Sequence, residues 1–101
     1  MNTLGQPDWQ PPTDIYNTND LIVIRVEIAG MRNSRFNAKL EDDKLIISGL
    51  RPTPTFMGAY SQMEIRFGEF TCEIPLPHPV QESDFEAKYN DGFLTITLPK
   101  K

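Results

Sequence analysis

The 101-residue chain carries 14 acidic and 10 basic residues, for a net charge of −4, and contains one cysteine, Cys72. Its length fits one domain, and the lack of a basic stripe excludes a typical nucleic-acid-binding protein. No apolar stretch reaches the roughly 18 residues of a membrane span, so we expect no membrane partner. A single cysteine cannot form an internal disulfide, which fits a reducing compartment and a cytoplasmic location.

The chain opens with a polar segment, residues 1–12, that includes Trp9 and three prolines. We expect a short flexible arm there, followed by one domain over residues 13–100. A short strand is predicted at 14–17. The clearest strand covers 21–28, because its apolar residues alternate on one face, as expected for a half-buried strand. These residues are Ile22, Ile24, Val26 and Ile28.

Two short strands follow, joined by the turn Glu41-Asp42-Asp43-Lys44. This turn would place Leu40 opposite Leu45, and Ala38 opposite Ile47. Both apolar sets then lie on the same face, so the register is consistent with one buried side.

The segment 50–63 is long for a compact domain, and Pro52 and Pro54 interrupt strand pairing at its start. Long segments of this kind are usually functional or disordered. Its Tyr60 and Met63 are candidates for a binding surface. Apolar residues on the second face of other strands are further candidates: Leu21, Val23 and Ile46.

A further strand is predicted over 69–76, with its buried face made of Phe70, Cys72, Ile74 and Leu76. The last hairpin turns at Asp91-Gly92, a pair typical of two-residue hairpin loops. That loop sets three apolar pairs on one face: Tyr89 with Leu94, Ala87 with Ile96, and Phe85 with Leu98. Six or seven strands, frequent turns and no convincing helix predict an all-β, antiparallel β-sandwich.

No catalytic constellation stands out. His78 lies between two prolines, and Cys72 falls on a buried strand face, where a small core residue is the simpler interpretation. Turn chemistry explains Asp42-Asp43, and three separate glutamates fit wet strand faces: Glu64, Glu69 and Glu73. We therefore expect no enzyme activity, no cofactor and no metal.

The stretch AKYNDGFLTITLP, residues 87–99, resembles the A-x-x-x-n-G-v-L signature of the alpha-crystallin domain of small heat-shock proteins. Ala87, Gly92 and Leu94 match it residue by residue. Three more stretches resemble the family in the same order: TDIYNTNDLIVIRVEIAGM, LEDDKLIISG and AYSQMEIRFGEFTCEIPLP. The resemblance is to the bacterial and plant type and covers nearly the whole chain.

The resemblance implies an immunoglobulin-like sandwich of about seven or eight strands that acts as an ATP-independent holdase for unfolding client proteins. It implies a homodimer, in which the long loop of one subunit pairs with the first strand of the other. The loop residues would be Tyr60, Ser61, Gln62 and Met63, and the strand residues Asp14, Ile15 and Tyr16. It also implies a groove between two edge strands that accepts an I-x-I tail or a client, lined by Phe36, Ala38, Leu40, Phe85, Ala87 and Tyr89.

Several features depart from the family pattern. Cys72 stands where many members carry an arginine, and Gln62 and Ile65 stand where basic residues are usual. We therefore expect a dimer contact based on backbone pairing and apolar side chains more than on salt bridges. The chain ends at Lys101 without an I-x-I tail and has a short arm, which favours a dimer over a large oligomer.

Two alternatives compete with this interpretation. A CS-type co-chaperone shares the sandwich but lacks the long dimerising loop. A plain binding or structural sandwich is the other, although a carbohydrate site would need exposed aromatic residues on one face. An enzyme is a remote third.

Overall fold

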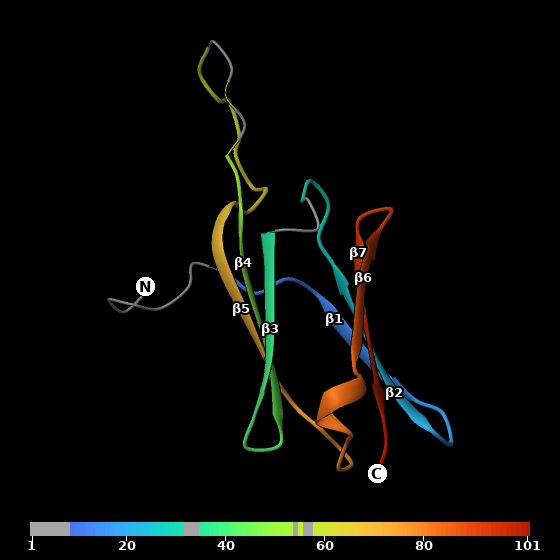
Figure 1. The fold of residues 1–101 in the computed structure, drawn as a ribbon. Coiled ribbons are helices and arrows are strands. Elements are labelled where there is room, and N and C mark those ends of the chain that lie inside the picture. Colours follow the sequence, from blue (N-terminus) through green and yellow to red (C-terminus); the bar gives the residue numbers. More distant parts are fainter. Residues whose placement is uncertain (1–8, 32–34, 54, 56–57) are drawn as a thin grey trace.

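The computed structural model describes residues 9–31, 35–53, 55 and 58–101, which form two packed antiparallel sheets (Figure 1). One sheet has the strand order β1-β2-β7-β6 and the other β3-β4-β5. The strands are β1 (Thr13–Asn17), β2 (Leu21–Glu27), β3 (Phe36–Glu41), β4 (Lys44–Arg51), β5 (Gly68–Pro75), β6 (Glu86–Asn90) and β7 (Phe93–Pro99), with a short 3₁₀ helix, η2 (Glu82–Asp84), before β6. The predicted all-β sandwich is therefore confirmed.

The core lies between the two sheets and follows the alternation of the sequence. In β2 the predicted face is confirmed, since Ile22, Ile24, Val26 and Ile28 are completely buried. From the other sheet, Leu45, Ile47, Phe70 and Cys72 meet them. Leu76 follows β5 and is half-buried against this cluster. Burying each large aliphatic side chain contributes about 1.5–3 kcal/mol, so this interior is the main source of stability.

Two tight turns set the registers of the hairpins. Asp42 and Asp43 have φ values of 50° and 63°, and Asp91 and Gly92 have values of 51° and 83°. Positive φ at both central positions defines a type I′ turn, whose twist matches that of the flanking strands. The predicted pairs of the first hairpin are confirmed, as are two of the second: Leu40–Leu45, Ala38–Ile47, Tyr89–Leu94 and Ala87–Ile96.

The third predicted pair of the last hairpin is not part of the ladder. The ladder between β6 and β7 has the predicted register but begins with Glu86 opposite Thr97, one residue after Phe85. Phe85 directly follows η2 with extended backbone angles of −77° and 146°. The chain joins the sheet edge only after η2 ends at Asp84, and Phe85 therefore lies one residue before the ladder.

Val23 also differs from the expectation that it belongs to an open surface. It is only 6% exposed although it alternates with the core residues of β2. Val23 lies on β2, a central strand of its sheet, opposite Tyr16 of β1 and Thr97 of β7. The two neighbouring strands therefore cover it from both sides. Leu21 and Ile46 are half-buried.

Part of the predicted flexible arm packs against the sandwich. Trp9 forms an isolated parallel bridge with Phe70 at the edge of β5, and their rings lie 5.6 Å apart. Pro11 is buried. Among the described residues, those from Trp9 onward thus include packed ones before residue 13, and residues 1–8 lie outside the described part of the chain. Met31, which follows β2, is 7% exposed and belongs to the core.

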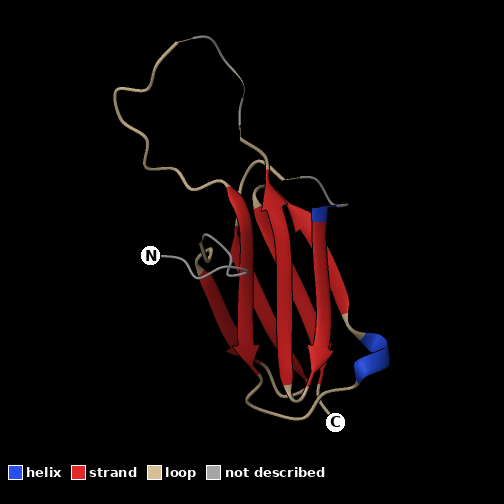
Figure 2. Cartoon of the chain, turned by 90° about the vertical axis from the view of Figure 1, so that its left-hand side faces the viewer, coloured by secondary structure: helices blue, strands red, loops and turns tan. Residues whose placement is uncertain are grey.

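The connection between β4 and β5 extends beyond the end of the sandwich (Figure 2). Its described residues from Gly58 to Arg66 are all exposed.

Gly49, near the end of β4, permits close packing of Phe70 and of the Arg35 backbone against this strand. A Cβ at Gly49 would lie 2.7 Å from the carbonyl oxygen of Arg35 and 2.7 Å from the ring of Phe70.

Candidate binding surfaces

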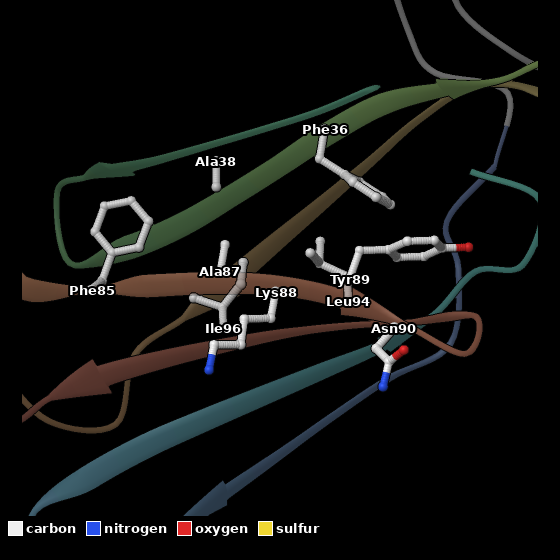
Figure 3. A pocket seen from close by; sticks show the side chains of 9 residues that line it. All are labelled: Phe36, Ala38, Phe85, Ala87, Lys88, Tyr89, Asn90, Leu94 and Ile96. Atoms are coloured by element: carbon white, nitrogen blue, oxygen red, sulfur yellow. The ribbon is translucent and has the colours of Figure 1, made fainter. Parts of the chain in front are cut away.

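A groove of about 650 Å³ runs between β3 and β6, which are edge strands of opposite sheets (Figure 3). Phe36 and Ala38 extend from β3 toward β6, while Lys88 and Asn90 of β6 point away from β3. Leu94 and Ile96 of β7 are buried and form the apolar floor. The groove is therefore apolar inside, with polar side chains at its outer margin.

Aromatic packing and hydrogen bonds hold one end of the groove in place. The rings of Phe36 and Tyr89 lie 5.2 Å apart and are tilted by 45°. The Tyr89 hydroxyl donates to the carbonyl oxygen of Ile28 over 2.7 Å and accepts from the amide of Met31 over 3.2 Å. These contacts fix Tyr89, so this wall is formed before any ligand enters, which lowers the entropy cost of binding.

The structure brings five of the six predicted groove residues together: Phe36, Ala38, Phe85, Ala87 and Tyr89. Leu40, the sixth, packs against the core and is not among the lining side chains. Leu94 and Ile96 were predicted only as apolar partners within the last hairpin, and they also form the floor of the groove. Their register with Tyr89 and Ala87 was the available signal, because paired residues share a face.

A second surface lies on β1 and on the connection after β4. Five of the large apolar side chains that remain exposed are found there: Ile15 (42%), Tyr16 (50%), Tyr60 (47%), Met63 (53%) and Ile65 (66%). Within the described residues β1 pairs on one side only, with β2. Its other edge therefore presents unpaired backbone groups beside apolar side chains, a combination that favours strand addition.

The residues predicted for the dimer contact fall into two separate groups within one chain. Asp14, Ile15 and Tyr16 lie on β1, whereas the four loop residues belong to the projecting connection. Ser61 and Gln62 are exposed like their neighbours, and Gln62 donates to the Glu64 carboxylate over 2.8 Å. Ile65 was not among the predicted contact residues, although the signal was present, since it stands where basic residues are usual in the family and adds an apolar side chain beside Met63.

The described residues contain no buried polar or charged side chain that resembles a catalytic centre. Burial raises the pKa of the Cys72 thiol, and a hydrogen bond with Thr13 opposes this shift only partly. The thiol is thus protonated at neutral pH, and a protonated thiol is a poor nucleophile. His78 is exposed, and its Nδ1 lies 2.8 Å from the carbonyl oxygen of Pro79.

Neither a metal centre nor a membrane span is evident in the part of the chain that the structure describes. There, His, Cys, Asp and Glu side chains form no group of three or more that could hold a metal ion. The same residues include no helix of the length and apolarity that crossing a membrane requires.

Comparison with known proteins gives a consistent result. The profile of the Hsp20/alpha crystallin family matches residues 14–101. A probable 15 kDa heat shock protein of Leptospira interrogans is 33% identical over 91 residues, which cover 90% of this chain and 70% of the relative. Heat shock protein 16.0 of Schizosaccharomyces pombe superposes with a TM-score of 0.82 at 29% identity, covering 92% of this chain and 88% of that one. The structure of hspA from Xanthomonas axonopodis superposes with a TM-score of 0.85 at 26% identity, covering 93% of this chain and 96% of that one.

Proposed function

The chain belongs to the Hsp20/alpha-crystallin family of small heat-shock proteins, and from this premise we propose how its two open surfaces serve an ATP-independent chaperone. The chaperone role follows from the family and from the solved relatives that share the fold. Small heat-shock proteins bind unfolded clients and form oligomers. Which surfaces of this chain carry these two activities is the subject of the proposal.

We infer that the groove between β3 and β6 binds an extended apolar segment of a client or of another subunit's tail. The observation that carries this inference is an apolar groove of about 650 Å³ bounded by two sheet edges. An extended peptide can pair with an exposed edge strand while its alternate side chains fill pockets. Small side chains, Ala38 and Ala87, line the middle of the groove and leave room for branched side chains of a ligand.

The second surface supports a homodimer formed by exchange. The loop residues Tyr60–Met63 of each subunit would pair with Asp14, Ile15 and Tyr16 of the other. The support is twofold: the apolar side chains of both segments are exposed in the single chain, and β1 has one unpaired edge. Reciprocal pairing would bury both segments around a two-fold axis, as is usual in homodimers.

Absence of catalysis and a cytoplasmic location complete the proposal. Support for the first comes from the family, whose members are generally non-catalytic, and from the protonated, buried Cys72 thiol. Support for the second is a lone cysteine, which fits a reducing compartment.

The test is light scattering from a heat-aggregating enzyme, without ATP, at near-stoichiometric amounts of this protein. We expect suppression of aggregation by the unaltered chain and weaker suppression by Ala87→Glu, which places a charge in the apolar groove. Lys39→Glu is the matched control, because Lys39 is exposed on β3 and does not line the groove. Equal suppression by both variants would exclude the groove as the client site.

A further inference from the structure

Arg51 ends β4 at the point where the projecting connection begins, and its side chain joins three separate parts of the chain. Its Nε donates to the carbonyl oxygen of Arg66 over 2.8 Å, and its Nη2 donates to the same oxygen. Its Nη1 donates to the carbonyl oxygen of Ala29, just after β2, over 3.3 Å. One guanidinium therefore links both ends of the connection to the opposite sheet.

Aromatic rings flank the same guanidinium. Its central carbon lies 4.4 Å from the centroid of the Trp9 ring and 5.2 Å from that of Phe67. Among the residues that the structure describes, the buried Trp9 Nε1 has no hydrogen-bond partner. The ring of Trp9 packs on Phe70 and on the guanidinium of Arg51, and its backbone forms the bridge to Phe70.

The charge of Arg51 strengthens these contacts. The side chain is half-buried, and burial lowers the pKa of the guanidinium while the nearby Tyr89 opposes the shift. Hydrogen bonds from a charged donor are shorter and stronger than those between neutral groups. The planar guanidinium can donate in two directions while stacking on rings, which the point charge of a lysine cannot do.

We propose that Arg51 is a positioning residue that closes the base of the 52–67 connection and directs its tip toward a partner subunit, with Trp9 covering the closure. This inference rests on the proposed dimer. It identifies Arg51 as the residue that holds the base of the loop in place before the loop pairs with a partner subunit. The loop leaves the sandwich after Arg51 and returns at Phe67. The guanidinium of Arg51 contacts the Phe67 ring and donates to the carbonyl oxygen of Arg66, the residue before it. The connection projects beyond the end of the sandwich (Figure 2), so a change of angle at its base would move the exposed tip.

The proposal explains why a long, exposed connection can act in dimerisation. A freely moving loop loses conformational entropy when it pairs, and this loss weakens binding. A fixed base removes part of that cost in advance. The last rung of the β4–β5 ladder, Arg51 opposite Gly68, is the element that the closure stabilises.

The experiment measures the dimer dissociation constant by sedimentation for Arg51→Lys and Arg51→Leu in the full chain. We expect a rise of about tenfold or more for both, since each loses a charge-assisted fork. Trp9→Ala should raise the constant less. Combined with Arg51→Lys it should add little, because the two residues act as one unit. Lys44→Leu is the control: Lys44 is on the same strand, at the end away from the loop, in an exposed ion pair with Glu73.

Amide hydrogen exchange at Leu50, Arg51 and Gly68 gives a second measurement that does not depend on dimerisation. Arg51→Lys should accelerate exchange there and leave the amides of β2 and β7 unchanged. An unchanged dissociation constant, or unchanged exchange at these amides, would overturn the proposal. If the unaltered chain is monomeric at every concentration, the proposed dimer fails, and the exchange data alone decide whether Arg51 closes the base.

Discussion

The two open regions of this chain, the β1 edge and the groove between β3 and β6, offer a partner different things. The β1 edge offers mainly backbone groups on a flat strand, with Ile15 and Tyr16 standing in solvent. The groove offers mainly shape, because side chains from β3, β6 and β7 surround a hollow. An edge strand alone is therefore suited to pairing with a defined segment, whereas two facing edges can accept varied apolar segments.

The difference arises from how far each sheet reaches over the other. Ala87 shares a face with the buried Leu94 and Ile96, yet it is exposed because it lies on the last strand of its sheet. Tyr89 on the same strand is half-buried, since Phe36 of the other sheet packs against it. The same alternating pattern thus produces core in the middle of a sheet and a groove at its margin.

Removal of the loop tip should have the largest effect, and it should act on dimerisation alone. Replacing Tyr60–Met63 with Gly-Ser-Gly-Ser should raise the dimer dissociation constant on the order of a hundredfold or more, because the central apolar contacts are lost. The fold should survive, since these residues are exposed. Sedimentation and thermal unfolding check the two parts. The control substitutes Thr53 and Thr55 with glycine, and an equal loss of dimer in that control would contradict the prediction.

The next largest effect concerns the stability of the core, against which both regions pack. Gly49→Ala should destabilise the fold by about 1–3 kcal/mol, because the new Cβ collides with a backbone carbonyl and with Phe70. Denaturant unfolding measures it, with Ser48→Ala as the neighbouring control. Since Phe70 contacts both Trp9 and Phe36, the variant should weaken groove binding and dimerisation together. An effect on one alone would show that the regions are independent.

A smaller effect separates the groove from the edge. Ala87→Trp should fill the groove and weaken binding of an Ile-x-Ile peptide by about tenfold or more, as expected when a buried apolar contact is lost. Dimerisation should not change. Fluorescence anisotropy of a labelled peptide provides the measurement, and Lys39→Trp, on the solvent side of β3, is the control. Unaltered peptide binding would place the ligand elsewhere.

The smallest effect concerns pH and the buried Cys72 thiol. The pKa of Cys72 is raised in the folded state, so above about pH 8.5, the usual thiol pKa, the unfolded chain loses this proton first. Stability from this group is complete below that pH and declines as the pH rises through the folded value. The stability advantage of the unaltered chain over Cys72→Ala should therefore shrink between pH 8.5 and 10 in urea unfolding. A constant difference would contradict the shift.

The sequence predicted the sandwich because its signals are local. Alternation marked β2, and Asp-Asp and Asp-Gly marked the two turns with their registers. The exposure of a side chain depends on the neighbouring strands and on the facing sheet, which the local pattern does not show. Val23 and Leu40 were for this reason assigned to open surfaces, although Val23 is buried and Leu40 packs against the core. The ladder of the last hairpin ends one residue short of Phe85, because a helical turn that no periodic signal announces precedes β6. The groove residues were proposed from a family resemblance, and their alternation alone would have assigned them to the core.

Arg51 shows most clearly what a strand pattern hides. Its neighbours in sequence, Leu50 and Pro52, give no sign of two carbonyl acceptors drawn from distant positions. A polar residue at a strand end is ordinarily read as solvent-facing. Only the arrangement of the two sheets brings Ala29 and Arg66 within reach of it.

The packing of Trp9 has an optical consequence. It is the only tryptophan in the chain, so its fluorescence reports on one place, the junction of arm, loop base and β5. Release of the arm should shift its emission to longer wavelengths while the circular dichroism of the sheets stays constant, whereas global unfolding should change both. The protein thus carries an intrinsic probe with which assembly can be followed in real time, without a label.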